Sequence, residues 1–537
     1  FYYEILACHM RTATNSIRPK TTTRQLPLPI SVMTALSAGA MFSLALAPYF
    51  IIPIAVLSPM LLYALLKKCD SPKRAFWLGE LYGFGTWVVG AFWLYHSIHH
   101  YGGVPSWAAL VLIGVMSLIM GLFHALMAWA FVRFSAKQPI SFAGFWILQE
   151  WLKTWVLSGF PWLFVGYAFT DISWLNGIAP IFGVFGLSFL AVFVGAAVIE
   201  LFYRNIGHII IGGMLTTAVI MISLIGINWT KPTGKLTSVS LIQGNIPQDL
   251  KWQEGFGVQT LGIYAGLSQS EWGRDLVVWP EAAIPLFQDE ASDHINALAK
   301  QANADGSAWI TGIMYRKTPS DESDQATFYN SVMLYDANQV SVYKKQQLVP
   351  FGEYVPFGGV LDILPGLEGV ASLSRGDDKQ TPLKLGSGVG DTIGAAICYE
   401  VAYPETTRKN ALGSNFLLTV SNDAWFGTTA GPLQHLQMVQ MRSLETGRWF
   451  VRATNNGVTA LIDHQGRIIK QIPQFQRDIL RGDVPSYVGR TPYMIWGHYP
   501  MLGLSLVLIF LSIMAKKMKN TTAKREKFYT ADGVVDR

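Results

Sequence analysis

Long apolar runs bounded by polar positions recur along the chain, seven of them before its middle and one near its end. A helix that spans a membrane needs about 20 mostly apolar residues, so these runs predict about eight transmembrane helices. The fifth run contains Glu150 and Lys153, which is unusual for a span. The predicted spans cover residues 30–46, 50–66, 76–98, 107–134, 140–157, 178–203, 208–229 and 495–515.

The long segment between the seventh and eighth runs has a different pattern. Short apolar runs of the β type alternate there with stretches that suit helices, such as 294–304 and 433–445. Apolar runs between polar turns are typical of buried strands that helices cover, so residues 230–494 are predicted to form one α/β domain. The expected strands are 238–244, 275–280, 307–314, 331–336, 392–399 and 416–423.

Lysine and arginine residues gather in alternate connections between the apolar runs. The connections near residues 67–74, 133–137 and 204 are basic, as is the C-terminal tail, whereas 99–106 and 158–177 contain no Lys or Arg. Basic loops stay in the cytoplasm, and because further spans follow the first run, we expect that run to be a retained helix and not a cleaved signal. The pattern predicts a cytoplasmic N-terminal segment (1–29), a transmembrane helical domain (30–229), an extracytoplasmic domain (230–494), a final transmembrane helix (495–515) and a basic cytoplasmic tail (516–537).

The composition agrees with a membrane protein. The chain of 537 residues is 51% hydrophobic and 14% charged, whereas soluble domains are about one-quarter charged. The net charge of +6 does not indicate nucleic-acid binding, since the basic residues lie at the ends of apolar runs. The three cysteines, Cys8, Cys69 and Cys398, are too few and too widely spaced for a disulfide framework. The sequence has no CxxC motif or Cys/His cluster, so no metal site is predicted.

Three short groups of reactive residues follow one another within the α/β segment. Glu281 and Cys398 each close an expected strand, and Lys344 and Lys345 precede the apolar stretch LVPF. Each group also has an ordinary structural interpretation: a glutamate in a surface turn, two solvated lysines, and a buried, inert cysteine. The occurrence of all three groups in one segment favours a catalytic role. Cys398 is the only cysteine of the segment, and its place at a strand end resembles a nucleophile elbow.

A cysteine nucleophile needs a proton acceptor, and histidine is the usual one. The histidines of the segment, such as His294, His435 and His464, show no spacing relative to Cys398 that indicates a catalytic pair. A glutamate base with a neighbouring lysine is the alternative. Glu281 would then take the thiol proton, and a lysine would stabilise the oxyanion.

The ordered set WPE, YKKQQLVPFGE and CYE resembles the Glu-Lys-Cys triad of the nitrilase (carbon–nitrogen hydrolase) superfamily. Longer strings, together with the order of spans, domain and last span, resemble the apolipoprotein N-acyltransferase family over residues 30–515. These strings are QGNIPQDLKW, WPEAAIP, LVPFGEYVPF, VSNDAWFG and VRATNNGVTALID. The resemblance implies a multi-span α-helical membrane domain plus a nitrilase-like α-β-β-α sandwich.

The resemblance also implies roles for individual residues. Glu281 is the general base and Cys398 the nucleophile. Lys345 and not Lys344 is the oxyanion lysine, because it lies two residues after Tyr343. Gln347 departs from the pattern, since the family is expected to have histidine there. The remaining implied residues are the supporting Glu353, Tyr399 and Glu400 and the substrate-binding Trp252.

The implied reaction is an acyl transfer in two steps. A thioester on Cys398 would carry a fatty acyl chain from a membrane phospholipid, with phosphatidylethanolamine as the expected donor. The acceptor would be the α-amine of the N-terminal diacylglyceryl-cysteine of a lipoprotein. The implied location is the bacterial inner membrane, with the catalytic domain on the periplasmic side and both termini in the cytoplasm. No cofactor, metal ion or nucleic acid is implied.

Two other functions remain open. A membrane-tethered nitrilase-type amidase would use the same triad on a soluble amide. A transporter with an extracytoplasmic domain would explain charges within spans, such as Glu80, Glu150 and Lys153, although no inverted repeat is visible. For the acyl transfer implied by the resemblance, the apolar stretch 355–373 after the lysine motif is predicted to be a lid or a membrane-facing arm.

Overall fold

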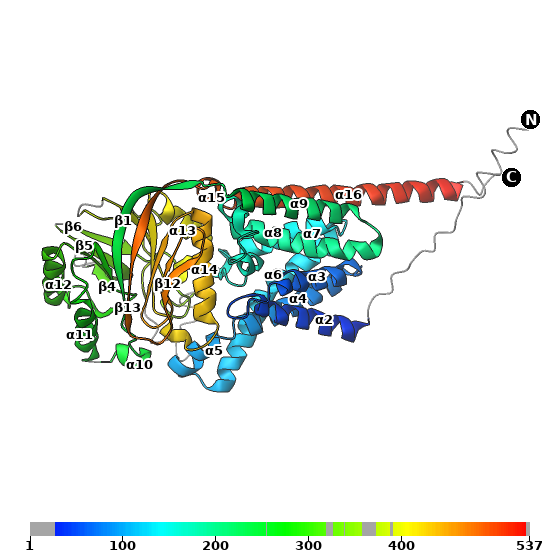
Figure 1. The fold of residues 1–537 in the computed structure, drawn as a ribbon. Helices are drawn as coiled ribbons and strands as arrows, with labels where there is room; N and C mark the ends of the chain where they lie inside the picture. Colours follow the sequence, from blue (N-terminus) through cyan, green and yellow to red (C-terminus); the bar gives the residue numbers. More distant parts are fainter. Residues whose placement is uncertain are drawn as a thin grey trace, which may run out of the picture.

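The structure is a computed structural model that describes residues 27–253, 255–317, 326–337, 339–356, 372–386 and 390–532. A helical bundle and a domain of two β-sheets lie end to end (Figure 1). The predicted lid, 355–373, lies outside the described residues apart from two residues at each of its ends.

Each of the eight predicted apolar runs contains a helix. The helices are α2 (Leu28–Met41), α3 (Pro53–Lys67), α4 (Pro72–Gly90), α6 (Ser106–Phe134), α7 (Pro139–Leu152), α8 (Ala179–Ile199), α9 (Gly207–Ile225) and α16 (Tyr499–Asp532). Short helical turns connect them: Phe42–Ala45, α5 (Leu94–His96), Ser97–Tyr101, Val156–Ser158, Val165–Phe169, Asn176–Ile178 and Glu200–Tyr203.

Five helical segments of the described chain are long and apolar enough to cross a membrane. They are Leu28–Ala45, Ser106–Phe134, Asn176–Tyr203, Gly207–Ile225 and Tyr499–Ala523. Of the other three helices, α3 and α7 have only 15 and 14 residues, and α4 carries Lys73, Arg74 and Glu80. The predicted number of eight spans therefore stays a prediction.

The outer surface of the bundle is apolar. On α6 and α9, Trp107 is 72% exposed and Leu224 is 69% exposed, and α16 exposes Leu506 and Phe510. Extended apolar surface is unfavourable in water and suits contact with lipid. The bundle therefore has the surface of a membrane domain.

Two mixed sheets form the second domain. The first has the strand order β13-β1-β2-β4-β5-β6, with β3 beside β4, and the second has the order β12-β11-β10-β9-β8-β7. All six expected strands are present. The strands are β1 (Thr230–Gln243), β2 (Leu276–Val278), β3 (Ile284–Phe287), β4 (Ala308–Lys317), β5 (Thr327–Asp336), β6 (Gln339–Lys344), β7 (Leu383–Lys384), β8 (Thr392–Ile397), β9 (Phe416–Ser421), β10 (Phe450–Thr454), β11 (Thr459–Ile462), β12 (Ile468–Ile472) and β13 (Asp478–Gly489).

Helices cover the outer face of each sheet, so the predicted α-β-β-α sandwich is confirmed. Side chains of a strand alternate between its two faces. Val278 and Leu418 pack in the core between the sheets, whereas Val277 packs in the core beneath the outer helices of the first sheet. The outer helices are α11 (Phe256–Ser268) and α12 (Ser292–Ala304) on the first sheet, and α13 (Pro404–Ala411) and α14 (Gly431–Thr446) on the second; α10 (Gln248–Lys251) and α15 (Pro492–Trp496) are short.

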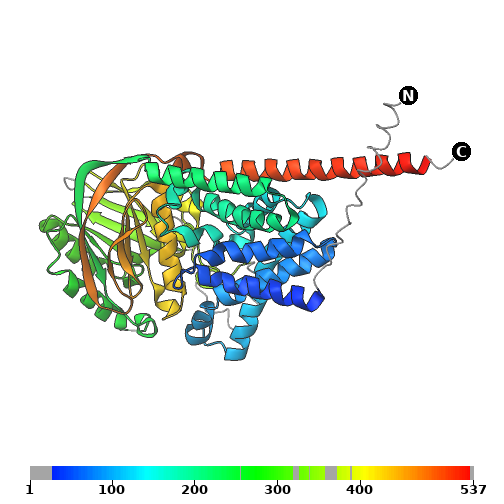
Figure 2. The same ribbon diagram turned by 45° about the vertical axis from the view of Figure 1, so that its right-hand side comes forward.

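Helix α14 lies between the second sheet and the helical bundle (Figures 1 and 2). One continuous apolar core joins the three layers, and it includes Leu417 of β9, Val439 of α14 and Phe164 of the bundle. Polar side chains of α14 are buried as well. Trp162 Nε1 donates to Gln434 at 2.7 Å, and the amide of Val184 donates to Glu445 at 2.8 Å. The bundle therefore holds the sheet domain in a fixed position.

Candidate active site

Cys398 follows directly on strand β8 in a sharp turn. Its φ is +50°, a conformation that costs a residue other than glycine about 1–3 kcal/mol. The residue is partly exposed, although its neighbours Ile397 and Tyr399 are buried. The turn thus presents a cysteine at the end of a buried parallel strand, as in a nucleophile elbow.

Glu400 holds this turn in place. Its carboxylate is fully buried and accepts hydrogen bonds from the amides of Ile397 at 2.6 Å and Gln346 at 2.5 Å. It also accepts from the hydroxyl of Tyr343 at 3.1 Å. Burial raises the pKa of Glu400 to about 7, against the lowering effect of these amide donors. Glu400 therefore joins the cysteine turn to the loop that carries Lys345.

Glu281 lies at the end of the other sheet and reaches across to the same place. Its Oε1 accepts from Asn330 Nδ2 at 2.8 Å, and its Oε2 accepts from the amide of Asn422 at 2.8 Å. Asn422 follows β9, the parallel neighbour of β8. Because the carboxyl ends of parallel strands meet at one edge of a sheet, this bond brings Glu281 to the edge that carries Cys398.

Lys345 is buried between two carboxylates. Its side chain is 1% exposed, and its Nζ lies 2.9 Å from Glu353 Oε1 and 3.4 Å from Glu281 Oε1. Asn330 also donates to Glu353, at 2.8 Å. The neighbouring Lys344 points elsewhere, since its Nζ lies 4.3 Å from the centre of the Tyr329 ring. Of the two lysines, the structure brings Lys345 to Glu281.

The charges of this group set the proton affinity of the thiol. Burial and then the Glu281 carboxylate raise the pKa of Cys398 well above its usual value, while Lys345 acts in the opposite direction. Burial alone would lower the pKa of Lys345, but Glu353 and Glu281 outweigh it and the pKa is raised. The group therefore favours a neutral thiol beside a permanent cation and a carboxylate that can accept the thiol proton.

His435 of α14 lies against Cys398, which the sequence spacing did not indicate. Its Nε2 lies 2.9 Å from the carbonyl oxygen of Cys398 and its Nδ1 lies 3.2 Å from Asp423 Oδ1. A carbonyl only accepts, so Nε2 carries the hydrogen. Cys398, Asp423 and His435 have ligand atoms within 4.8 Å of one another. However, Asp423 Oδ2 accepts from Arg452 at 2.6 Å, so hydrogen bonds already occupy the aspartate and the imidazole.

Replacement of His435 by alanine is expected to lower kcat for acyl transfer by roughly 10- to 100-fold, since small displacements of a nucleophile have effects of this size. KM should change little, because the ring contacts the backbone of Cys398 and not a substrate. His435→Gln retains a donor for the Cys398 carbonyl and should recover much of the rate. Steady-state kinetics of both variants checks this positioning role, which fails if glutamine is as slow as alanine.

Tyr399 and Trp252, two other residues implied by the sequence, have different surroundings. The Tyr399 hydroxyl donates to the carbonyl of Gly159 in the bundle at 3.2 Å, and its ring stacks on that of Trp162. Trp252 is 51% exposed at the end of α10. Tyr399 therefore links the cysteine turn to the membrane domain, while Trp252 is available at the surface.

Several polar residues around the triad were not predicted from the sequence. Asn330 bridges the two carboxylates, and Asn422 binds Glu281 through its amide. Lys251 is buried and donates to the carbonyl of Glu281 at 3.1 Å; burial lowers its pKa to about 8, against the effect of Glu281. Lys251, Asn422 and Asp423 stand in the strings QGNIPQDLKW and VSNDAWFG, which were a signal for their presence at the site.

Two families and several relatives match the chain. Residues 38–197 match the apolipoprotein N-acyltransferase N-terminal domain, and residues 238–493 match the carbon-nitrogen hydrolase family. An apolipoprotein N-acyltransferase of Pseudomonas aeruginosa is 40% identical over 91% of this chain and 96% of its own length. That of Pseudomonas putida is 40% identical over 91% and 97%.

A carbon-nitrogen hydrolase crystal structure from Helicobacter pylori aligns with 46% of this chain and 89% of its own, at 14% identity and a TM-score of 0.36. The full-length relatives match both the bundle and the sheet domain. With its apolar helices, the chain is a bacterial membrane protein, and it belongs to the apolipoprotein N-acyltransferase family.

Proposed function

We propose that the chain transfers a fatty acyl chain from a membrane phospholipid to the N-terminal amine of a lipoprotein, through a thioester on Cys398. The observation that carries this proposal is the arrangement of Lys345 between Glu281 and Glu353, beside a cysteine turn that is fixed to a membrane bundle. The family relatives support the same reaction, since they are named apolipoprotein N-acyltransferases.

In the first step, Glu281 accepts the proton of the Cys398 thiol, and the sulfur attacks the carbonyl carbon of a phospholipid ester. The Lys345 ammonium stabilises the negative charge on the carbonyl oxygen. The ester C–O bond then breaks, and Glu281 returns its proton to the leaving oxygen. The products are a lysophospholipid and a thioester on Cys398.

In the second step, the α-amine of a diacylglyceryl-cysteine attacks the thioester carbonyl. Glu281 accepts a proton from the amine, and the C–S bond breaks to release the Cys398 sulfur, which recovers a proton from Glu281. An amide forms on the lipoprotein. Glu281 thus accepts and returns a proton in each of the two steps.

The acyl donor is proposed to enter from the bilayer, with phosphatidylethanolamine as the expected species. Tyr399 and Tyr403 both donate to the carbonyl of Gly159, at 3.2 and 3.0 Å. Gly159 follows the short turn after α7. These contacts join the cysteine turn to the end of the bundle, where an apolar chain would approach from lipid. The exposed Trp252 is proposed to contact a substrate.

The proposed orientation has the sheet domain in the periplasm and both termini in the cytoplasm. Basic residues of the connections predicted to be cytoplasmic meet at one end of the bundle. Lys67 pairs with Glu200 at 2.7 Å and Lys137 with Asp70 at 2.9 Å, and Lys516 donates to the carbonyl of Arg133 at 2.8 Å. The opposite connection, near Gly159, meets the sheet domain. This division of charge supports the topology and the domain bounds proposed from the sequence.

The test is the intact mass of the purified protein after incubation with phosphatidylethanolamine. Wild type is expected to gain one fatty acyl group, and Cys398→Ala none. Cys69→Ala is the matched control, because Cys69 is the other described free cysteine and is buried in the bundle; it should gain the adduct as wild type does. Addition of a diacylglyceryl-cysteine peptide should remove the adduct and acylate the peptide.

The same measurement separates this function from a membrane-tethered amidase. An adduct that water removes as fast as the peptide does would indicate a hydrolase. A folded wild-type protein that gains no acyl group from phospholipid would contradict the proposal.

A further inference from the structure

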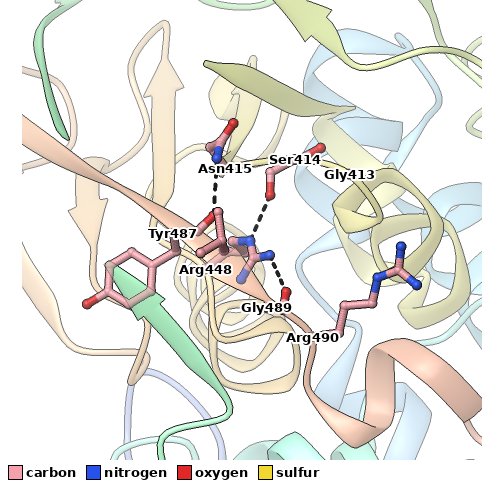
Figure 3. Close-up of a pocket in the computed structure, with 8 residues that line it drawn as sticks. Gly413, Ser414, Asn415, Arg448, Tyr487, Gly489 and Arg490 are labelled. Carbon is pink, nitrogen blue, oxygen red and sulfur yellow. Dashed lines mark hydrogen bonds between the residues drawn. The ribbon is translucent and has the colours of Figure 1, made fainter. Parts of the chain in front are cut away.

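A cavity lies in the sheet domain, built from residues that the proposed reaction does not use. Its volume is about 210 Å³. It is formed where the end of β13 passes the loop before β9 and the start of β10 (Figure 3). The lining residues are Gly413, Ser414, Asn415, Arg448, Tyr487, Val488, Gly489 and Arg490.

Arg448 is a buried cation with only neutral partners. The residue is 3% exposed. Its Nε donates to the carbonyl of Ser414 at 2.8 Å and its Nη2 to that of Gly489 at 2.6 Å (Figure 3). The remaining nitrogen, Nη1, is buried and has no hydrogen-bond partner. Burial and the charge of Arg490 lower the pKa of Arg448 to about 10, so its surroundings disfavour the positive charge.

Arg490 adds a second positive charge to the same cavity. It is exposed at the end of β13 and its side chain lies on the other side of Gly489 from that of Arg448 (Figure 3). Within the described ranges, neither arginine forms an ion pair with a carboxylate. A buried charge without a counter-charge is costly, and two cations beside one cavity attract an anion.

The cavity lies close to the membrane helices along the chain. Gly489 pairs with Thr230 of β1, and Thr230 follows α9 by five residues. On the other side, α16 begins at Tyr499, nine residues after Arg490. Both connections between the sheet domain and these two apolar helices therefore leave the domain beside the cavity.

We propose that this cavity is a binding site for a phosphate group, held by Arg448 and Arg490. Guanidinium groups bind phosphate oxygens through paired, charge-assisted hydrogen bonds, and a phosphate oxygen would give the buried Nη1 of Arg448 the hydrogen-bond partner that it lacks. The position beside α9 and α16 favours the phosphate of a phospholipid headgroup, and inorganic phosphate has the same chemistry. The site is separate from the cysteine turn and does not depend on the proposed acyl transfer.

Binding is measured on the full chain in detergent by native mass spectrometry, with three probes. Diether phosphatidylglycerol has a phosphate with net charge and no ester to react with Cys398. Diether phosphatidylcholine has a phosphate with a neighbouring cation, and inorganic phosphate has no lipid. The variants are Arg490→Gln and Arg448→Gln, and Arg477→Gln is the matched control, since Arg477 is an exposed arginine of the same domain whose Nε donates to Gly244.

Wild type and Arg477→Gln are expected to bind phosphatidylglycerol more tightly than phosphatidylcholine, and Arg490→Gln to bind it at least about tenfold more weakly, as expected for one lost charge-assisted contact. Arg448→Gln should lose binding as well. If that variant does not fold, because Arg448 also holds two carbonyls, Arg490→Gln decides. Binding of inorganic phosphate that depends on Arg490 supports the site. Binding of phosphatidylglycerol that depends on Arg490, without binding of inorganic phosphate, supports the site and identifies the ligand as a phospholipid headgroup. Equal affinity of wild type and Arg490→Gln for every probe overturns the proposal.

Discussion

Glu281→Gln is expected to slow acylation of Cys398 by phospholipid by about 10²- to 10⁴-fold, the usual contribution of a general base. The glutamine side chain has the same size and can still accept the hydrogen bond from the backbone N–H of Asn422, but it cannot act as a base. The rate of adduct formation, followed by intact mass, measures the effect. Glu290→Gln is the control, because it removes an exposed carboxylate that pairs with Arg316 and is not a partner of Lys345 or Cys398.

The same variant should change alkylation of the thiol in the opposite sense. After burial, the Glu281 carboxylate is the next largest cause of the raised pKa of Cys398. Its removal should lower that pKa, so the pH profile for reaction with iodoacetamide should move to lower pH. Slow acylation together with easier alkylation would indicate that the variant has lost its general base, because a misfolded site would not show this combination. A profile that moves to higher pH, or acylation at the wild-type rate, would rule out Glu281 as the base.

Lys345→Met is expected to reduce acyl transfer by about 10²- to 10³-fold, as removal of an oxyanion donor does in other enzymes. Lys345 lowers the pKa of Cys398 in the wild type, so the alkylation profile should move to higher pH, opposite to that of Glu281→Gln. Lys344→Met is the matched control. Its ammonium lies over the rings of Tyr315 and Tyr329, and the variant should keep its activity.

Lys345→Met should also destabilise the fold, because Glu281 and Glu353 are left without a buried counter-charge. Breaking a buried ion pair in this way costs about 3–5 kcal/mol. The double variant Lys345→Met, Glu353→Gln removes one negative charge as well, and it should recover much of the melting temperature without recovering activity. Activity that returns with stability in the double variant would contradict a chemical role for Lys345.

The order of the elements and the identity of the reactive residues were accessible from the sequence, because both depend on local patterns. Strand β8 is a continuous apolar run that ends at Ile397, so the position of Cys398 after it follows from its neighbours. The wider site depends on contacts between distant segments. Asn330 contacts Glu281 from 49 residues away and His435 contacts Cys398 from 37 residues away. The hydrophobic periodicity of a sequence reports local structure and does not predict such contacts.

Helix α14 shows the limit of the hydrophobic pattern. Gln434, Gln437, Arg442 and Glu445 are typical of a solvent-facing side, yet all four are buried. Gln434, Gln437 and Glu445 have partners in the bundle, for example the carbonyl of Tyr167, to which Gln437 donates at 2.9 Å, and Arg442 pairs with Glu445 of the same helix. A helix face with these amide and charged side chains can be exposed to water or buried in a polar interface. Only the position of the neighbouring domain determines which of the two occurs.

The place of α14 has a consequence for how the chain can be divided. A fragment cut at residues 230 and 494 would carry this helix away from the bundle, and the groups that now satisfy Gln434, Gln437 and Glu445 would be left behind. The severed face would present apolar side chains such as Leu436 and Val439 between these polar groups. A water-soluble version of the sheet domain therefore requires redesign of the outer face of α14. Truncation alone would expose an apolar interface that promotes association with other proteins.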